Sequence, residues 1–417
     1  MSPELNVKEN LQIVNSIDNL LIRYIIFFMI NRRAAPILKI LAKGYPVITI
    51  TGPRQSGKTT LARFVFKHKP YVSLEEPDQM EFANEDPRGF LARYPDGAVL
   101  DEAQRCPALF SYLQGIVDKD KRHGLFVLTG SQQFGLISRI TQSLAGRAGL
   151  LHLLPFSLGE LKAGNILYKG IDDLLLKGFY PPVYDRELSP SNWYANYIFT
   201  YVERDVRQMV NVRDLSAFQR FVRMCAARTG QMLNLSQLAN DCGITHNTAR
   251  AWLSILEASY ILFLLKPHHK NFGKRLIKTP KLYFYDTGLA AWLLGITDVK
   301  QMSIHAMRGF LFESLLVSEL LKGRYNRGLA SNLYFWRDNT GNEIDVLVEK
   351  ADTLVPIEIK SGQTVTKDYF TGLKKWLTIA GTSAESPYVI YGGSESQKRS
   401  GIEVLPWQDI VKLSDNL

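Results

Sequence analysis

Hydrophobic residues in the first part of the chain gather in short runs that are almost entirely apolar. The runs are residues 47–50, 71–74, 98–100 and 125–128. Each predicts a strand that is covered on both faces, because a half-exposed strand would alternate with polar residues. The stretches starting at Arg32, Lys58 and Leu109 repeat apolar residues every three or four positions, which indicates amphipathic helices. Strands that alternate with helices predict a parallel α/β sheet with helices on both faces.

The hydrophobic pattern changes after Phe156, where the sequence becomes typical of helices and rich in Trp and Tyr. Two further modules follow, the first compact and the second mixed in helix and strand. The expected domains are residues 1–28 as an N-terminal extension, 29–155, 156–217 as a helical connector, 218–300 and 301–417. Met29 is an alternative start of the chain, and the N-terminal mass of the native protein decides between Met1 and Met29.

Composition narrows the class of protein. The 417 residues hold 50 Lys and Arg against 40 Asp and Glu, so the net charge is +10 and favours partners that carry phosphate. Cys106, Cys225 and Cys242 have neither disulfide nor zinc spacing, which fits a cytoplasmic protein. The apolar run 20–30 is interrupted by Arg23 and is far shorter than the ~20 residues of a spanning helix, so we expect no membrane segment.

Residues 52–59 fit the phosphate-loop pattern G-x-x-x-x-G-K-[ST] between a predicted strand and a predicted helix. A chance match is expected in only about one such chain in a hundred at ordinary residue frequencies. Lys58 is expected to reach the β and γ phosphates of ATP, and the Thr59 hydroxyl to hold Mg²⁺. The predicted nucleotide-binding residues are Gly52, Pro53, Arg54, Gln55, Ser56, Gly57, Lys58, Thr59 and Thr60.

An acidic pair, Asp101 and Glu102, ends the third predicted strand. We expect Asp101 to complete the Mg²⁺ shell and Glu102 to orient and deprotonate the attacking water. Such a pair by itself is more often a solvated strand end. Because it accompanies a phosphate loop, it predicts ATP hydrolysis.

Two more positions are candidates for the same reaction. Thr129 or Ser131, after the fourth predicted strand, is expected to sense the γ-phosphate, although either is equally a candidate turn residue. Arg147 lies between two glycines and is a candidate for an arginine that a neighbouring subunit supplies, which predicts a homo-oligomer. The alternative is a surface arginine on a turn.

A family resemblance rests on the segments GPRQSGKTTLAR, YVSLEEPD, EDPRGFL, VLDEAQ, VLTGSQQ, SLAGR, LLPFSLGEL, GFYPPVY and TYVERDVRQ. The chain resembles prokaryotic AAA-type ATPases whose C-terminal half is a domain of unknown function with a nuclease-like core. The resemblance runs from about Met29 to near the C-terminus and implies an ATPase core of the ASCE type. The residues that match its active-site motifs are Lys58, Thr59, Asp101 and Glu102, with Ser131 and Arg147 matching less closely. It leaves the cellular role open.

Residues 235–245 resemble a helix-turn-helix, which predicts a winged-helix-like module. Ser236 is expected to cap the first helix and Thr245 the second, with Gly243 in the turn. The residues expected to face inward are Ile244, Ala249 and Trp252, and those expected to face a DNA groove are His246, Asn247 and Arg250. The basic loop 266–275 between two wing strands suits contacts with phosphates. A packing or oligomer surface is the alternative.

The last module contains Asp345 and the pattern Glu358-Ile359-Lys360 on two predicted paired strands, after Glu313 on a helix. Glu358 and Lys360 share one face of their strand because side chains alternate. This matches the D…E-x-K pattern of restriction-endonuclease-like folds, in which the carboxylates bind Mg²⁺. An exposed pair on a fold that has lost its activity is the alternative.

The predicted fold is therefore an α/β P-loop ATPase core, a helical connector, a winged-helix-like module and a PD-(D/E)xK nuclease-like domain. The leading hypothesis is an enzyme that couples the state of its ATP site to DNA engagement, with nuclease activity in the C-terminal domain as a further possibility. The alternative is an ATP-dependent regulatory switch whose nuclease-like domain is an inactive protein-interaction module. Whether Arg204, Arg207 or neither acts as a second sensor stays open.

Overall fold

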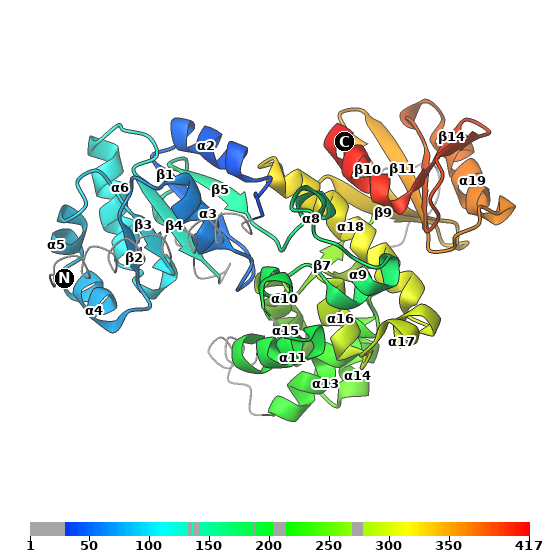
Figure 1. The fold of residues 1–417 in the computed structure, drawn as a ribbon, viewed down its shortest axis with the longest axis horizontal. Coiled ribbons are helices and arrows are strands. Elements are labelled where there is room, and N and C mark those ends of the chain that lie inside the picture. The colour runs from blue at the N-terminus through cyan, green and yellow to red at the C-terminus, as the bar shows by residue number, and fades with distance from the viewer. Residues whose placement is uncertain are drawn as a thin grey trace, which may run out of the picture.

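The computed structural model describes residues 30–131, 136, 140, 142–186, 188–202, 214–268 and 278–417. Figure 1 shows an N-terminal α/β domain at one end, helical segments in the middle and below, and a second sheet at the other end. The predicted extension 1–28, Arg204, Arg207 and most of the basic loop 266–275 lie outside the described residues.

The N-terminal sheet has the order β2-β3-β4-β1-β5, with every neighbouring pair parallel. Its strands are β1 (Val47–Thr51), β2 (Tyr71–Ser73), β3 (Val99–Asp101), β4 (Phe126–Gly130) and β5 (Ala148–His152). The helices are α2 (Ala35–Gly44), α3 (Lys58–Val65), α4 (Pro77–Glu85), α5 (Pro87–Ala92) and α6 (Leu109–Lys119), with the 3-10 turn η1 (Ala103–Arg105) after β3. The prediction of a parallel sheet is confirmed, and the four expected strands form β1 to β4.

Three elements of this domain did not emerge from the hydrophobic pattern. β5 lies at the edge of the sheet, alternates half-buried with buried residues, and contains Gly149, a residue type that is depleted in strands. α4 and α5 begin at Pro77 and Pro87, two prolines that mark breaks when read from sequence alone. Proline is tolerated in the first turn of a helix, where its missing N–H has no partner to lose.

The connector contains α8 (Leu158–Ala163), α9 (Ile171–Lys177), α10 (Pro181–Asp185), α11 (Pro190–Tyr197) and the π-helical turn η2 (Ile198–Val202). Its aromatic residues pack together, with the rings of Trp193 and Tyr197 stacked at 4.9 Å between centroids and Tyr180 beside both. This buried aromatic cluster explains the tryptophan and tyrosine content of the segment.

The next module contains α13 (Leu215–Ala226), β6 (Gln231–Met232), α14 (Leu235–Cys242), α15 (His246–Ala258), β7 (Leu262–Leu265) and β8 (Lys281–Phe284). Its three strands are antiparallel in the order β6-β8-β7, and α16 (Thr287–Leu293) and α17 (Val299–Ile304) follow. Gly243 adopts φ +69° in the turn and Thr245 caps α15, as expected. The expectation for Ser236 is wrong: Asn234 caps α14, and Ser236 lies inside the helix.

The C-terminal module opens with α18 (Arg308–Asn326) and has a six-stranded sheet in the order β13-β14-β12-β11-β10-β9. The strands are β9 (Leu333–Arg337), β10 (Glu343–Lys350), β11 (Thr353–Lys360), β12 (Tyr388–Tyr391), β13 (Gln397–Arg399) and β14 (Ile402–Pro406). The other helices are α19 (Thr371–Ala380) and α20 (Ile410–Asn416), and the 3-10 turns are η3 (Lys367–Phe370), η4 (Gly381–Ser383) and η5 (Trp407–Asp409). The expected pair 342–348 and 355–360 is confirmed as antiparallel β10 and β11.

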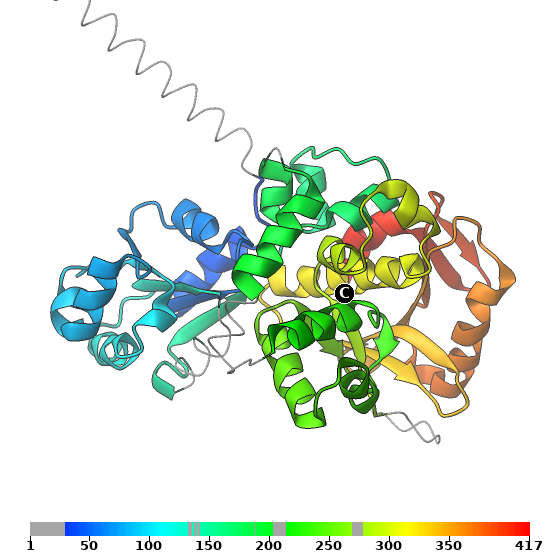
Figure 2. The ribbon, with the colours of Figure 1, turned by 90° about the horizontal axis from the view of Figure 1, so that it is seen from below.

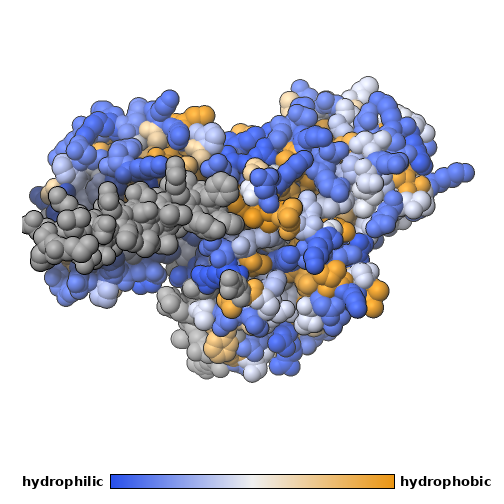
Figure 3. Space-filling model, in the orientation of Figure 1, coloured by the Kyte–Doolittle hydropathy of each residue, from blue (hydrophilic) through white to orange (hydrophobic). Residues whose placement is uncertain are grey.

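α18 lies in the middle of the molecule, between the helical modules and the C-terminal sheet, in both ribbon views (Figures 1 and 2). Twelve of its 19 residues are buried. One hydrophobic cluster runs from the connector through α18 to the C-terminal helix, so the modules after residue 154 share a core. Figure 3 shows a mostly hydrophilic face whose broadest hydrophobic area is near the centre, where these parts meet.

The N-terminal domain contacts the module of α13 to β8 through the Tyr260 hydroxyl group. The Tyr260 hydroxyl lies 2.8 Å from Thr51 Oγ1 and 2.8 Å from His152 Nδ1, at the ends of β1 and β5. Burial lowers the pKa of His152 to about 4, so its ring is neutral near pH 7. Among the described helices, none is both long enough and apolar enough to cross a membrane.

Candidate functional site

The loop between β1 and α3 turns at two glycines. Gly52 has φ +149°, and a Cβ at this position would lie 2.1 Å from the carbonyl oxygen of Leu153. Gly57 has φ +91° and is the N-cap of α3. Only glycine fits the first position and glycine is strongly favoured at the second, so the backbone of residues 52–57 can wrap closely around an anion at the start of α3.

Lys58 and Ser56 line the inside of this loop. Lys58 is 6% exposed, and its Nζ donates to the carbonyl oxygens of Gly52 at 3.0 Å and Pro53 at 2.7 Å. Ser56 Oγ is buried and has no hydrogen-bond partner in the structure. A buried hydroxyl normally has a partner. A buried ammonium beside an unpaired hydroxyl at a helix N-terminus fits a bound polyphosphate.

The other loop residues lie farther toward solvent. Arg54 forms a long ion pair with Glu75 at 3.9 Å, between Arg54 Nη1 and Glu75 Oε1. Gln55 adopts φ +61°, and Thr60 is exposed in the first turn of α3.

Three hydroxyl groups converge on Asp101 at the end of β3. Thr59 Oγ1 donates to Asp101 Oδ2 at 2.9 Å, and the Tyr71 hydroxyl donates to the same oxygen at 2.8 Å. The Thr129 hydroxyl donates to the other carboxylate oxygen. The loop and the acidic residue meet because β4 lies between β1 and β3 and all three strands end at the same edge.

Glu102 follows Asp101 and turns away from the strand with φ +54°, a conformation that costs about 1 kcal/mol or more for a non-glycine residue. Its Oε2 accepts hydrogen bonds from Ser131 Oγ at 3.2 Å and from the Gln104 side chain. Glu102 is 9% exposed. A strained, buried carboxylate beside a phosphate loop is typical of a functional position.

Arg147 lies at the opposite edge of the sheet. It precedes β5, its carbonyl accepts from Val47 at the start of β1, and its side chain pairs with Asp118 at 2.6 Å. The loop follows the end of β1, so Arg147 is not part of the loop site of its own chain.

Arg32 is a residue that the sequence did not single out. Its Nη1 donates to the carbonyl of Ser56 at 2.5 Å, its Nη2 to the carbonyl of Leu154 at 2.6 Å, and its Nε to Glu160 at 3.0 Å. The Arg32 side chain is 8% exposed. Glu160 also completes the capping box of α8, so Arg32 ties the phosphate loop to the connector. Its partners are 24 to 128 residues away, and no local pattern points to them.

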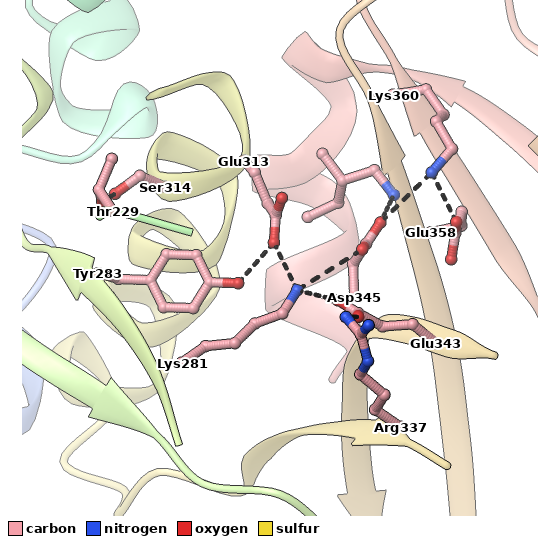
Figure 4. A network of polar contacts seen from close by, with 11 residues as sticks. Thr229, Lys281, Tyr283, Glu313, Ser314, Arg337, Glu343, Asp345, Glu358 and Lys360 are labelled. Carbon is pink, nitrogen blue, oxygen red and sulfur yellow. Dashed lines mark hydrogen bonds and ion pairs between the residues drawn. The ribbon is translucent and has the colours of Figure 1, made fainter. Parts of the chain in front are cut away.

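The four C-terminal candidates lie together (Figure 4). Lys360 Nζ is 2.6 Å from Glu358 Oε1 and 3.7 Å from Asp345 Oδ2. The backbone N–H of Ile359 donates to Asp345 Oδ2 at 2.8 Å. Glu313 reaches the same region from α18.

Lys281 of β8 lies among these carboxylates, and the sequence did not single it out. Lys281 Nζ is 3.1 Å from Glu313 Oε1 and 3.9 Å from Asp345 Oδ1, and it also pairs with Glu343 (Figure 4). Lys281 is 3% exposed. A lysine from the preceding module thus stands in the centre of the cluster.

Burial and charge shift the titration of this cluster. Burial raises the pKa of Glu313 to about 7 although Lys281 opposes the shift. Burial, reinforced by the nearby Asp345, raises the pKa of Glu358 to about 8. Burial alone would lower the pKa of Lys281, but Tyr283 and the carboxylates outweigh it and hold the pKa above its usual value. Lys281 is therefore charged at neutral pH.

The predicted DNA-facing residues lie on α15. Asn247 and Arg250 are exposed and His246 is half-buried, while Ala249 and Trp252 are buried as expected.

The sheet order, the phosphate loop and the acidic end of β3 define a P-loop ATPase of the AAA type. The matching family model, "AAA domain", covers residues 44–162. Two models described as "Domain of unknown function", DUF8612 and DUF4143, match residues 168–300 and 308–410. The chain thus binds and hydrolyses ATP through its N-terminal domain. For the C-terminal half, these matches name no activity.

The particular family is shown by two relatives. Uncharacterized proteins of Mycobacterium tuberculosis and Mycobacterium bovis are each 32% identical to the chain over 341 residues, which is 81% of the chain and 75% of each relative. The chain belongs to the same family as these two proteins.

Two solved structures show a remote likeness to the chain. The Walker-type ATPase of Pyrococcus abyssi aligns over 64% of this chain and 96% of its own, with 16% identity and a TM-score of 0.45. The Holliday junction branch migration motor of Thermotoga maritima aligns over 55% and 88%, with 17% identity and a TM-score of 0.28. At these scores neither likeness carries weight for function.

Proposed function

We propose that the chain hydrolyses ATP at the loop 52–57 with the help of Mg²⁺ and residues from β3 and β4. The observation that carries this proposal is the convergence of Thr59 and Asp101, whose side chains are 2.9 Å apart, beside the buried Glu102. A hydroxyl and a carboxylate are oxygen ligands of the kind that Mg²⁺ prefers.

Each residue has one task in this scheme. Lys58 would bind the β and γ phosphates once its Nζ leaves the loop carbonyls. Thr59 and Asp101 would hold Mg²⁺, and the ion would supply positive charge to the phosphates. Glu102 orients the attacking water and accepts its proton. We assign the sensing of the γ-phosphate to Ser131, whose hydroxyl donates to Glu102, because the Thr129 hydroxyl donates to Asp101.

Replacing Glu102 by Gln tests the proposal. We expect ATP to bind with unchanged affinity while turnover falls by about 10²- to 10⁴-fold, because the base is lost and the binding residues stay. Glu76→Gln, at an exposed carboxylate near the site, is the control and should turn over ATP normally. Unchanged turnover in Glu102→Gln would remove Glu102 from the mechanism.

We also propose that Arg147 completes the site of a neighbouring subunit, since its own loop is at the other edge of the sheet. Mixing Lys58→Ala and Arg147→Ala chains, each inactive alone, should restore part of the activity, because one mixed interface carries both intact residues. No recovery in a mixed oligomer would contradict a role in trans.

A second candidate function belongs to the C-terminal module, where we propose a nuclease-like site coupled to DNA engagement. Its support is that Glu313, Asp345, Glu358 and Lys360 meet at one end of β10 and β11. The helices α13, α14 and α15 beside the antiparallel strands β6 to β8 support the proposal of a winged-helix-like module, in which the exposed Asn247 and Arg250 would contact DNA.

Two measurements test this second function. DNA should stimulate the ATPase rate if the modules are coupled, and Arg250→Ala should reduce the stimulation. Mg²⁺-dependent DNA cleavage, if present, should disappear in Asp345→Ala. A wild-type protein without cleavage would favour the alternative, a regulatory switch whose C-terminal domain binds a partner, and the ion pairs of Lys281 favour that alternative in the arrangement seen here.

A further inference from the structure

The centre of the carboxylate cluster holds a positive charge that belongs to the protein. Three carboxylates, Glu313, Glu343 and Asp345, form ion pairs with one ammonium group, that of Lys281. They come from α18 and β10, whereas Lys281 comes from β8 of the preceding module. Carboxylate oxygens are the ligands that divalent cations prefer, but among the described residues no group of three or more Asp, Glu, His or Cys side chains is arranged to hold a metal ion.

Lys281 is fixed in this position by the packing of β8 against α18. Ser314 Oγ donates to the carbonyl of Phe284 at 3.1 Å, and Ser318 Oγ donates to the carbonyl of Tyr285 at 2.8 Å. The Tyr283 hydroxyl donates to Glu313 at 2.5 Å. The lysine therefore stands on a strand that is bonded along α18, and not on a free loop.

One acceptor of the cluster is unused. Glu358 is 9% exposed, its Oε1 receives Lys360, and its Oε2 is buried without a hydrogen-bond partner. A buried carboxylate oxygen without a partner costs free energy. Its presence indicates that the cluster has more acceptor capacity than the two lysines satisfy.

We infer that Lys281 is the resident cation of this cluster and excludes a divalent metal ion from it. The inference rests on the proposed C-terminal site and assigns its regulation. An ammonium and a metal ion cannot share Glu313 and Asp345, because two cations a few ångströms apart in a buried site repel strongly. In this arrangement the site is closed to metal, and cleavage would require β8 to withdraw.

Removing the charge of Lys281 should open the site. Without it, the three carboxylates would keep only Lys360 and Arg337 as cationic partners among the described residues, a state that favours uptake of a proton or of a metal ion. The full-length Lys281→Met variant keeps an unbranched side chain that is one atom shorter and removes its charge. Lys278→Met, at an exposed lysine just before β8, is the matched control.

The experiment is a titration with Mn²⁺ followed by electron paramagnetic resonance at neutral pH, without nucleotide. We expect wild type and Asp345→Asn to bind Mn²⁺ alike, since the cluster takes none. Lys281→Met should gain one site, at least about tenfold tighter than any site of wild type, and Lys281→Met/Asp345→Asn should lose it. Lys278→Met should behave as wild type.

Two results would overturn the inference. One is Mn²⁺ binding by wild type that Asp345→Asn removes, a comparison that does not depend on the folding of a Lys281 variant. The other is a folded Lys281→Met or Lys281→Gln protein, judged by circular dichroism and ATPase rate, that gains no site. A gained site without DNA cleavage would reject the nuclease proposal alone and leave the inference standing.

Discussion

Arg32 lies outside the phosphate loop and donates a hydrogen bond to the carbonyl of Ser56. In a trans peptide the C=O and N–H groups point in opposite directions, so this bond turns the N–H of Gly57 away from Arg32. The guanidinium is buried and also bonded to Leu154 and Glu160, which fixes its own position. Arg32 is thus a positioning residue for a loop whose N–H groups are its means of binding phosphate.

Replacing Arg32 by Ala should therefore weaken ATP binding. Charge-assisted hydrogen bonds contribute about 1.5–3 kcal/mol each, so we expect at least a tenfold rise in the Kd for ATP, measured by calorimetry. Arg32→Lys should recover only part of the affinity, because an ammonium cannot reproduce the planar fork.

Arg33→Ala is the matched control, since the Arg33 side chain forms an exposed pair with Asp415. Exposed pairs contribute little, so ATP binding should be unchanged. An equal loss of ATP affinity in Arg32→Ala and Arg33→Ala would show that Arg32 affects binding only through the stability of the protein.

At the scale of elements, α18 connects the two proposed sites. Glu313 on its first half reaches the carboxylate cluster, while Glu319 accepts from the N–H of Leu158 at 2.8 Å and Lys322 donates to the carbonyl of Phe156 at 2.8 Å. Glu319 and Lys322 are also paired at 2.8 Å, with side chains 3% and 2% exposed. This buried pair holds the start of α8 against α18.

Lys322→Met should destabilise the protein by about 3–5 kcal/mol in urea unfolding, because Glu319 is left as an unpaired buried charge. Glu319→Gln/Lys322→Met should cost less than Lys322→Met alone, and the double-mutant cycle gives the coupling. As a control, Lys398→Met breaks the exposed pair with Glu403 and should change stability by less than about 1 kcal/mol. Additive single changes would mean that the pair is not coupled.

At the scale of the whole molecule, a half-buried histidine, His152, joins the ATPase domain to the rest. His152 contacts Thr51 at 3.0 Å and Tyr260 at 2.8 Å, and its ring lies 4.9 Å from that of Tyr325 on α18. Burial lowers its pKa to about 4, from the model-peptide value of 6.5. Between these two pH values the unfolded chain binds a proton that the folded chain does not.

The contribution of His152 to stability is therefore present above pH 6.5 and is lost as the pH falls towards 4. Between about pH 7 and about pH 5, the free energy of unfolding in urea should fall in wild type and in His152→Gln. We expect the fall to be about 1–2 kcal/mol smaller in His152→Gln. His123→Gln, at an exposed histidine, should follow wild type. Parallel pH profiles of wild type and His152→Gln would contradict this assignment.

The sequence by itself determined the parts that depend on neighbours along the chain. The short, mainly apolar runs predicted β1 to β4, and the loop motif predicted a phosphate site, because strand burial and loop conformation follow from residues within a few positions. The edge strand β5 and the proline-headed helices α4 and α5 were missed, since their local patterns resemble those of turns. The pairing of β10 with β11 was also predicted from the sequence, and alternation along β11 put Glu358 and Lys360 on one face.

Only the tertiary structure decided which distant groups meet. Arg32 and Glu160 are 128 positions apart, and Lys281 is 32 positions from Glu313. No spacing rule connects such residues, because the path of the chain between them is set by packing of the shared core. The presence of a phosphate loop was thus a local property of the sequence. The fixation of that loop by Arg32, and the filling of the C-terminal cluster by a lysine, are properties of the assembled fold.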